Sequence, residues 1–313
     1  MSKVAFIFSG QGSQYPGMGK ELYDNFIDCK EVFINANKVL GFDLAKICFE
    51  GSEEQLSVTE ITQPAVLTVS IAAMKALIHN GVRPHVTAGF SLGEYSSLVC
   101  SGVLEFSEAV ALVRKRGRFM QEAVPLEKGG MTAVLGLDRQ KIIDSCKVAS
   151  DAGVVEAVNF NCPGQVVIAG EKDALLKATE ILTNLGGKCI PLPVSAPFHS
   201  SLLKKAAENL KEELIGVNIK DMEVPVLTNV HGNYIKDKSE IRDLLVKQAM
   251  SPVLWEDIIN KMIEDGVDVF IELGPGKTLT GFMKKINRKV TALNVQDIKS
   301  LNNTLEVLSK ING

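Results

Sequence analysis

The sequence lacks the cysteine patterns of a metal site or a disulfide framework. Its six cysteines are widely spaced, and no two of them form a C-x-x-C pair. It also lacks an excess of one charge, because the net charge is only −3 and lysine and arginine are scattered along the chain. This distribution gives no support for nucleic-acid binding. The cysteine usage is that of a protein in a reducing compartment.

Long hydrophobic runs are scarce as well. The apolar start Val4–Phe8 is too short for a signal peptide, and no apolar stretch approaches the length that crosses a membrane. We therefore expect a cytoplasmic protein without a membrane partner. The contents of 46% hydrophobic and 23% charged residues are typical of a soluble globular protein. With 313 residues, the chain suffices for one large domain with an insertion or for two ordinary domains.

Strand-like runs alternate with helical patterns along most of the chain, which predicts an α/β fold with a largely parallel sheet. Two helices are clear: Pro64–His79, with its proline in the first turn, and Ser107–Ala123, with Ser107 as the capping residue. The predicted strands of the sheet are Val4–Phe8, Val86–Phe90, Pro225–Thr228, Val267–Leu273 and Lys289–Leu293.

The segment from about residue 130 to residue 194 has a different order of elements. The patterns predict a strand (131–137), a helix (138–150), two strands (154–159 and 165–170), a helix (171–185) and a strand (188–193). This β-α-β-β-α-β order is that of the ferredoxin-like unit. Turn-forming residues on both sides indicate an insertion, so we divide the chain into residues 1–127 with 195–313 and an inserted part, 128–194. A cleft between the two parts is the expected position of a functional site.

The segment Gly89–Gly93 matches the motif G-x-S-x-G and lies between a predicted strand and a predicted helix that begins at Leu92. The glycines permit a tight turn that exposes Ser91 at the helix N-terminus, where backbone N–H groups stabilise an oxyanion. A chance match is the alternative, but a chain of this length and composition contains the pattern by chance only about 0.1 times. The motif therefore indicates that Ser91 is a nucleophile.

A nucleophilic serine needs a general base, and the sequence contains four histidines. His79 ends a predicted helix, His231 lies in a predicted turn, and His85 precedes a predicted strand. A purely structural role is the alternative for each of them. His199 lies where the chain leaves the inserted part, at the expected cleft, and is therefore the best candidate for the base.

Two glycine-rich loops match nucleotide-binding motifs only in part. In the loop over residues 9–17, the dinucleotide fingerprint requires a glycine where the chain has Tyr15. Gly274–Thr278 ends like a P-loop, but the first glycine of that motif would fall at Ile271, so the loop is too short to surround a triphosphate. An NTPase is therefore the weakest of the functions considered.

Arg116 falls on the apolar stripe of the predicted helix Ser107–Ala123, whereas Arg114 and Arg118 point away from that stripe. A guanidinium on an apolar face needs an anion. One interpretation is a structural salt bridge or a side chain that extends to solvent; the other is a substrate carboxylate, which a planar guanidinium binds through two hydrogen bonds.

Together, these motifs resemble the malonyl-CoA:acyl carrier protein transacylases of type II fatty acid synthesis, which are related to the acyltransferase domains of polyketide synthases. The resemblance extends over essentially the whole chain, and its motifs follow one another in the family's order. They are Phe8–Gln14, Thr62–Ala65, Gly89–Tyr95, Arg114–Arg118, Asn161–Val167, Ser195–Ser201 and Glu272–Thr278.

The resemblance implies both a fold and a reaction. The large part would be an α/β-hydrolase-like subdomain with a parallel sheet, and the inserted part a ferredoxin-like subdomain. The protein would transfer a malonyl group from malonyl-CoA to Ser91, and then to the phosphopantetheine thiol of an acyl carrier protein. It would need no metal or other bound cofactor, and we expect a monomer.

The resemblance also implies the catalytic groups. Ser91 would be the nucleophile and His199 the base, and the backbone amides of Gln11 and Leu92 would form the oxyanion hole. The backbone carbonyl of Gln248 would orient the imidazole, so no acidic third member would be required.

The substrate-binding residues are implied in the same way. Arg116 would bind the malonyl carboxylate, and Gln63 and Phe198 would contact the substrate, with Phe198 leaving little room for a branch methyl. The chain departs from the family at Phe90, where histidine is common before the nucleophile. The sequence therefore does not decide which polar contacts, if any, are made beneath the turn.

Two rival functions also remain open on the sequence alone. A serine hydrolase of lipase or patatin type would share the turn at Ser91, but the sequence has no H-G-G-G oxyanion loop. A non-catalytic module that binds the carrier protein would not need Ser91, His199 and Arg116 together.

Overall fold

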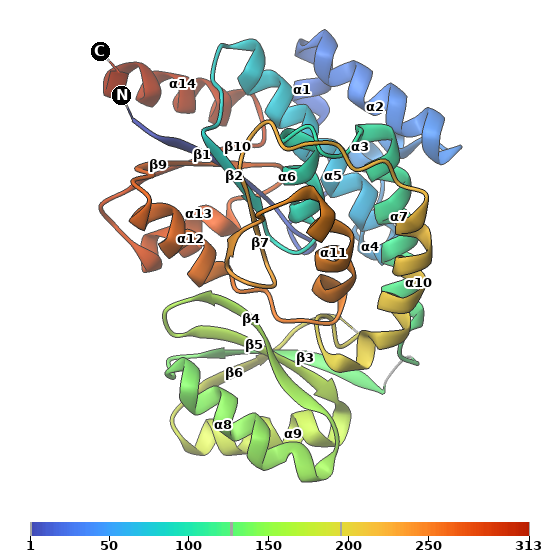
Figure 1. Cartoon of the computed structure of the whole chain (residues 1–313), viewed down its shortest axis with the longest axis vertical. Helices are drawn as coiled ribbons and strands as arrows, with labels where there is room; N and C mark the ends of the chain where they lie inside the picture. The colour runs from blue at the N-terminus through green and yellow to red at the C-terminus, as the bar shows by residue number, and fades with distance from the viewer. Residues whose placement is uncertain (1, 126–127, 195, 313) are drawn as a thin grey trace.

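The larger of two β-sheets forms the centre of the molecule. The computed structural model describes residues 2–125, 128–194 and 196–312. Within them, the larger sheet consists of β10 (Thr291–Val295), β9 (Val269–Leu273), β1 (Val4–Phe8), β2 (Val86–Gly89), β7 (Val226–Thr228) and β8 (Asn233–Tyr234), in this order (Figure 1). All neighbouring strands are parallel except the edge pair β7 and β8. The predicted α/β fold with a largely parallel sheet is confirmed.

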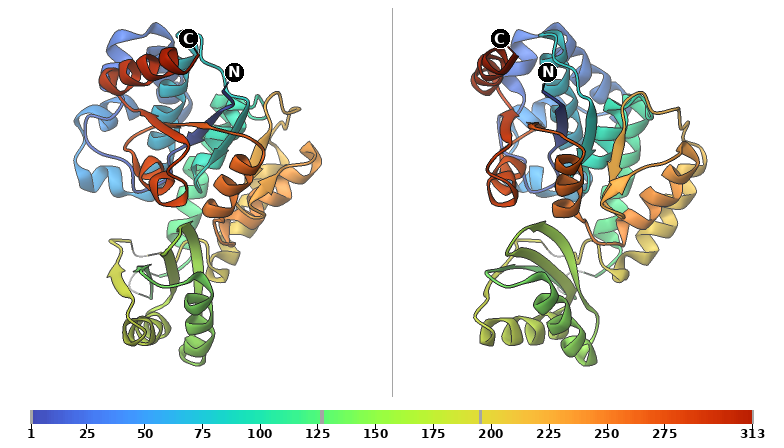
Figure 2. Two further views of the ribbon diagram at one scale, coloured as in Figure 1. Left: turned by 90° about the vertical axis from the view of Figure 1, so that its left-hand side faces the viewer. Right: turned by 60° about the vertical axis from the view of Figure 1, so that its left-hand side comes forward.

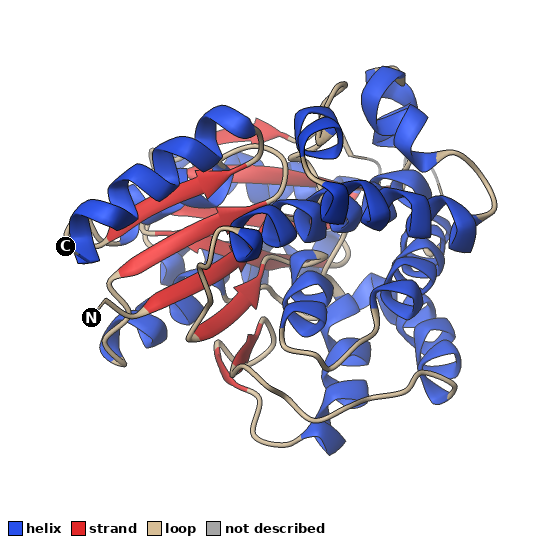
Figure 3. Ribbon diagram, turned by 90° about the horizontal axis from the view of Figure 1, so that it is seen from above, coloured by secondary structure: helices blue, strands red, loops and turns tan. Residues whose placement is uncertain are grey.

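Helices cover both faces of this sheet (Figure 3). All five residues of β1 are buried, with Phe6 and Phe8 in the hydrophobic core on one face and Ala5 and Ile7 in the core on the other. A parallel strand covered on both faces is expected to be a continuous apolar run, which explains the composition of β1.

The helices fall into two groups by the core that they join. The core on one face contains side chains from α2 (Ile27–Leu40), α5 (Thr59–His79), α6 (Gly93–Cys100), α7 (Phe106–Glu122), α10 (Lys204–Ile215), α11 (Ile241–Ala249) and α14 (Ile298–Asn312). The core on the other face contains side chains from α12 (Trp255–Glu264) and α13 (Thr278–Ile286). Shorter helices near the N-terminus are α1 (Lys20–Asn25), α3 (Leu44–Glu50) and α4 (Glu53–Ser57).

Helix α5 differs from its prediction in two respects. It begins at Thr59, so Pro64 lies inside the helix and not in its first turn. It is also long and apolar enough to cross a membrane, contrary to the expectation that no stretch approaches that length. However, 83% of the apolar window is buried inside the fold. The apolar composition of α5 is therefore explained by its position in the core.

Helix α7 also begins earlier than predicted. Its first residue is Phe106, and the capping position is Glu105, whose side chain accepts no hydrogen bond from the helix. Ser107 lies inside the first turn and is not the cap. The predicted apolar face is present, since Arg116 is buried, Arg118 is exposed and Arg114 forms a partly exposed ion pair with Glu60.

The smaller sheet is antiparallel and has the order β4-β5-β3-β6. Along the chain its elements are β3 (Gly129–Leu135), α8 (Arg139–Ala149), β4 (Val155–Cys162), β5 (Gln165–Glu171), α9 (Lys172–Asn184) and β6 (Lys188–Pro191), with the short 3-10 helix η1 (Ser150–Ala152) after α8. The predicted element order is confirmed. Helices α8 and α9 pack on one face of this sheet (Figures 1 and 2).

Strand β4 attaches the smaller sheet to the larger part. The Phe160 amide donates to the Val253 carbonyl at 3.0 Å, and the Val253 amide donates to the Val158 carbonyl at 2.8 Å. Arg139 donates to both carboxylate oxygens of Asp257 at 2.9 Å. The division at residues 127 and 195 falls on positions outside the described residues, and it stays a proposal.

Candidate active site

Ser91 lies in a sharp turn between β2 and α6. Its φ is +52°, in the left-handed region that costs a non-glycine residue about 1–3 kcal/mol. The turn requires glycine on both sides. A Cβ atom on Gly89 would lie 1.8 Å from the Gly93 backbone, and a Cβ atom on Gly93 would lie 2.2 Å from the Phe8 carbonyl oxygen. The G-x-S-x-G spacing is therefore explained by the close approach of the backbone segments.

His199 is the histidine that the structure brings to Ser91. The Ser91 Oγ and His199 Nε2 atoms are 2.6 Å apart, and His199 Nδ1 lies 2.9 Å from the Gln248 carbonyl oxygen. Because the carbonyl only accepts, Nδ1 carries the proton and Nε2 accepts from the serine hydroxyl. Burial, together with the nearby Arg116 cation, lowers the pKa of His199 to about 4. A neutral imidazole at this position is able to take the proton of Ser91.

The other three histidines lie in different surroundings. His85 Nδ1 accepts a hydrogen bond from the Val4 amide at 3.0 Å, and His79 Nδ1 lies 3.5 Å from an Asp28 carboxylate oxygen. His231 lines a separate cavity. None of these three therefore shares the surroundings of Ser91.

Arg116 extends from α7 to the same place and is 1% exposed. Its Nη1 donates to the Gln63 side-chain oxygen at 2.8 Å, and its Nη2 donates to the Gln248 side-chain oxygen at 3.0 Å and to Ser91 Oγ at 3.4 Å. The guanidinium lies 5.3 Å from the Tyr95 ring centre. In the described parts of the chain, no carboxylate oxygen lies within 4.0 Å of it. The hydrogen-bond partners of this buried cation among the described residues are thus neutral groups.

Two backbone amides near Ser91 have no hydrogen-bond acceptor in the part of the chain that the structure describes. Gln11 follows β1, and Leu92 follows Ser91 at the start of α6. Neither amide donates a hydrogen bond to an acceptor in the described residues. In contrast, the Ser91 amide donates to the Asn229 side-chain oxygen at 2.7 Å. The free amide of Leu92 at a helix start and that of Gln11 in the turn after β1 are both donors suited to an anionic oxygen.

Gln11, Ser91, Arg116 and His199 line a cleft of about 480 Å³ between the two sheets. Phe198 lines the cleft beside His199. The larger part contributes Gln11, Gln63, Phe90, Ser91 and Arg116, and the smaller sheet contributes Met131, Ala133, Asn159, Asn161 and Val167.

Phe90 makes apolar contacts beneath the turn. The sequence alone did not show what replaces the polar contacts of the histidine that is common at this position. Its ring packs edge-on against Trp255 at a centroid distance of 5.6 Å and lies 6.4 Å from the Phe282 ring centre. Both Phe90 and Phe282 line the cleft. The departure from histidine at this position is therefore accommodated by an aromatic cluster below the turn.

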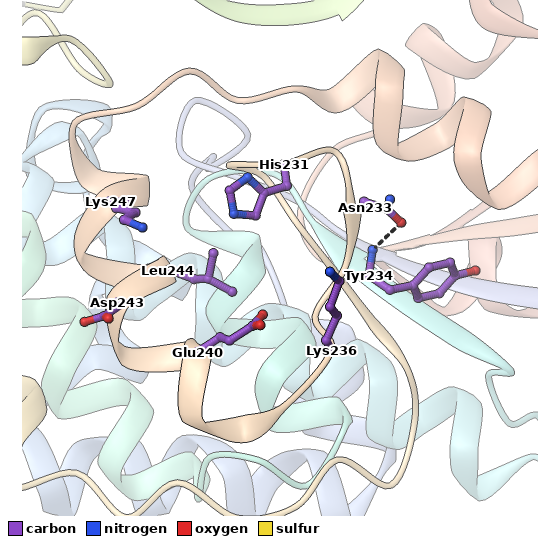
Figure 4. Close-up of a pocket in the computed structure, with 8 residues that line it drawn as sticks. All are labelled: His231, Asn233, Tyr234, Lys236, Glu240, Asp243, Leu244 and Lys247. Carbon is purple, nitrogen blue, oxygen red and sulfur yellow. Dashed lines mark hydrogen bonds between the residues drawn. The ribbon is translucent and has the colours of Figure 1, made fainter.

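A second cavity of similar volume lies at α11 and β8 (Figure 4). Its lining combines His231 with Tyr234, Leu244 and the charged groups Lys236, Glu240, Asp243 and Lys247. It contains neither Ser91 nor Arg116, and its charges are of both signs. Chemistry, and not size, therefore distinguishes the cleft at Ser91 as the candidate active site.

The loop Gly274–Thr278 has no free helix end for a phosphate. The carboxylate of Glu272 accepts hydrogen bonds from the Leu279 amide at 3.1 Å and from the Thr280 amide and hydroxyl at 2.7 Å. The Glu272 carboxyl group thus takes the Leu279 and Thr280 donors of α13, and the interpretation of this loop as a P-loop is not supported.

Asn229 and Glu94 are site residues that the sequence analysis missed. Asn229 holds the Ser91 amide, and Glu94 accepts from the Asn229 amide at 2.9 Å. The position of Asn229 directly after β7 was a usable signal, because ligands bind at the carboxyl ends of parallel strands.

A serine in a sharp turn after a strand of a largely parallel sheet, with a neutral histidine at 2.6 Å, is an arrangement suited to acyl transfer. A family model described as the acyl transferase domain matches residues 5–303. The malonyl CoA-acyl carrier protein transacylase of Bacillus subtilis is 46% identical, and the match covers 100% of this chain and 99% of that relative. The chain belongs to the malonyl CoA-acyl carrier protein transacylase family.

Solved structures agree with this assignment. The malonyl CoA-acyl carrier protein transacylase of Clostridium perfringens is 49% identical, with a TM-score of 0.97 and coverage of 99% of this chain and 98% of that one. A malonyl-transacylase, PlMCAT, solved in complex with its type II polyketide acyl-carrier protein, is 42% identical, with a TM-score of 0.95 and coverage of 97% and 99%. The predicted family and fold are confirmed.

Proposed function

We propose that this chain transfers the malonyl group from malonyl-CoA to the phosphopantetheine thiol of an acyl carrier protein through an ester on Ser91. The observation that carries the proposal is the meeting of three groups in one cleft: the Ser91 hydroxyl, the neutral His199 imidazole and the buried Arg116 guanidinium. A lipase has no use for a buried cation beside its nucleophile. The names of the relatives support malonyl-CoA as donor, and the PlMCAT complex supports the carrier protein as acceptor.

In the first half-reaction, Ser91 Oγ attacks the thioester carbonyl while its proton passes to His199 Nε2. The oxyanion that forms would be held by the amides of Gln11 and Leu92. When the tetrahedral intermediate collapses, the carbon–sulfur bond breaks, and the departing sulfur of coenzyme A takes the proton from His199. The product is the malonyl ester of Ser91.

The second half-reaction runs through the same groups. The thiol of the carrier protein gives its proton to His199 and attacks the ester carbonyl. The bond to Ser91 Oγ then breaks, and that oxygen recovers a proton from His199. The Gln248 carbonyl would keep the imidazole in the required tautomer during both steps, since it accepts from Nδ1.

Arg116 would bind the free carboxylate of the malonyl group, because its buried guanidinium forms no ion pair within 4.0 Å with a carboxylate of the described residues. Gln63 would fix the guanidinium through its hydrogen bond to Nη1, and Phe198 would limit the width of the acyl site. Cytoplasmic location, a monomeric state and the absence of a bound cofactor stay predictions.

The proposal is tested by intact mass. Malonyl-CoA alone should add one malonyl group to the protein, and peptide mapping should locate it on Ser91, because the first half-reaction needs no acceptor. Subsequent addition of a phosphopantetheinylated carrier protein should remove the adduct and malonylate the carrier. An adduct on Cys162 or another thiol would reject the assignment of Ser91.

The pH dependence of acylation gives a second test. Only neutral His199 accepts a proton, and its pKa is lowered to about 4. The kcat/KM for malonyl-CoA should therefore stay nearly constant from pH 7 to about pH 5 and fall as the pH approaches 4. Stopped-flow measurement of single-turnover acylation gives this profile. A fall centred near pH 6.5, the ordinary pKa of histidine, would show that burial does not hold the imidazole neutral.

A further inference from the structure

Glu94 is a buried carboxyl group that the proposed mechanism does not use. It is the second residue of α6, three positions after Ser91, and it is fully buried. No lysine or arginine in the described residues forms an ion pair with it. One of its oxygens, Oε2, accepts from the Asn229 amide at 2.9 Å and from Gln248 Nε2 at 3.1 Å. A carboxyl group in such a place is costly, so these two partners of Oε2 indicate its role.

The first partner, Asn229, holds the strained turn closed. Its side-chain oxygen accepts from the Ser91 amide, and its Nδ2 donates to the Gly89 carbonyl, both at 2.7 Å. One amide side chain therefore bridges the two sides of the nucleophile turn. Because Ser91 has a positive φ, the turn keeps this geometry only if the surroundings fix it.

The second partner, Gln248, holds the groups that act on Ser91. Its Nε2 donates to the Ser91 carbonyl at 2.7 Å, and its own backbone carbonyl accepts a hydrogen bond from His199 Nδ1. Its side-chain oxygen accepts from Arg116. Thus the imidazole, the guanidinium and the serine backbone all contact one residue.

We propose that Glu94 is a positioning residue for the reaction: its Oε2 joins Asn229 to Gln248 and so fixes the Ser91 hydroxyl relative to His199. Three segments that are far apart in the sequence meet at this single oxygen, from α6, from the end of β7 and from α11. Gln248 Nε2 also lies 3.5 Å from the Asn229 side-chain oxygen, and the two shorter hydrogen bonds to Glu94 Oε2 reinforce this weak direct link. The inference rests on the proposed function in so far as Ser91 is the nucleophile.

The experiment measures the reactivity of Ser91 with a probe that carries no malonyl group. A fluorophosphonate ester reacts with serines that are activated by a base, and its labelling rate depends on the distance between Ser91 and His199. Glu94→Ala should slow labelling about 100-fold, the cost of a misplacement of about 1 Å in a reacting group. Glu94→Gln keeps an oxygen that accepts both hydrogen bonds, so labelling should stay within about tenfold of the original rate.

A matched control removes a buried hydrogen bond far from the cleft. Thr304 is fully buried in α14, and its hydroxyl donates to the Asn294 carbonyl at 3.0 Å. Thr304→Val should lower the melting temperature but leave the labelling rate unchanged. If Glu94→Ala has the same pattern, Glu94 is only a structural residue and the inference is overturned. Equal losses in Glu94→Gln and Glu94→Ala would also overturn it, because the hydrogen bonds would then not be the cause.

Two further variants complete the test. If Glu94→Ala does not fold, Glu94→Asp withdraws the carboxyl group by one methylene and should slow labelling with little change in melting temperature; an unchanged rate would contradict the inference. Ser91→Ala should abolish labelling. Persistent labelling of Ser91→Ala would refute the proposed nucleophile. Normal labelling of the unsubstituted protein without malonylation would refute the proposed substrate. Both outcomes differ from the results that would refute the role of Glu94.

Discussion

Replacement of His199 by alanine should slow the malonylation of Ser91 by about 10²- to 10⁴-fold, the usual contribution of a general base. The Ser91 Oγ and His199 Nε2 atoms are 2.6 Å apart, and no other histidine in the described chain lies within hydrogen-bond reach of this serine. Rapid-quench measurement of the malonyl-enzyme gives the rate. Binding of malonyl-CoA should survive, since Arg116 keeps its contacts with Gln63 and Gln248.

Two other histidines serve as controls for this prediction. His231 lies in the cavity at α11 and β8, and the ring of His85 accepts from the Val4 amide. Alanine at either position should leave acylation within about threefold, because neither ring reaches the cleft. If His231→Ala or His85→Ala is the crippling change and His199→Ala is mild, the base has been assigned to the wrong histidine.

The sequence predicted those parts of the molecule that depend on local patterns. β1 is apolar at every position because both of its faces are covered, and such a run is visible without a structure. The turn at Ser91 was visible for a related reason. Its glycines are required by backbone contacts within a few residues and with the neighbouring strand, so the requirement appears as a fixed spacing.

Helix boundaries were predicted less well because the usual capping residues are absent. Helix α5 begins after Val58 and α7 after Glu105, and neither side chain caps its helix. The sequence contains a proline and a serine a few residues later, which are typical of helix starts. Helix α5 starts five residues before its proline, at a buried Thr59, whereas α7 starts one residue before Ser107.

The hydrogen bonds around Ser91 could not be predicted from spacing. Asn229 lies 135 residues after Glu94 and 19 residues before Gln248, and only the packed fold brings the three side chains to one point. The burial of Arg116 was predictable from helical periodicity, but its neutral partners were not, because they lie on α5 and α11. Local patterns therefore predict which residues face the site, and tertiary packing decides what holds them.

Replacement of Arg116 by alanine should lower the kcat/KM for malonyl-CoA. The expected loss of transition-state binding energy is about 2–5 kcal/mol, the usual loss when a desolvated charge pair loses one partner. The malonyl group has a free carboxylate and the acetyl group does not. Acetyl-CoA should therefore be affected little, or become a better substrate because the buried cation is gone. Arg116→Lys should rescue only in part, since an ammonium group lacks the planar fork.

The same measurements separate this role from a structural one. Arg114 lies two positions before Arg116 on α7 and pairs with Glu60 at 2.9 Å, so Arg114→Ala is the matched control. It should change neither specificity constant by more than about twofold, because a partly exposed ion pair contributes little.

If Arg116 were only a structural cation, its loss would lower the melting temperature and impair both substrates alike. Parallel losses for malonyl-CoA and acetyl-CoA in a destabilised protein would contradict the carboxylate-binding role. A loss confined to malonyl-CoA in a stable protein would place the substrate carboxylate on Arg116, because only that group distinguishes the two acyl donors.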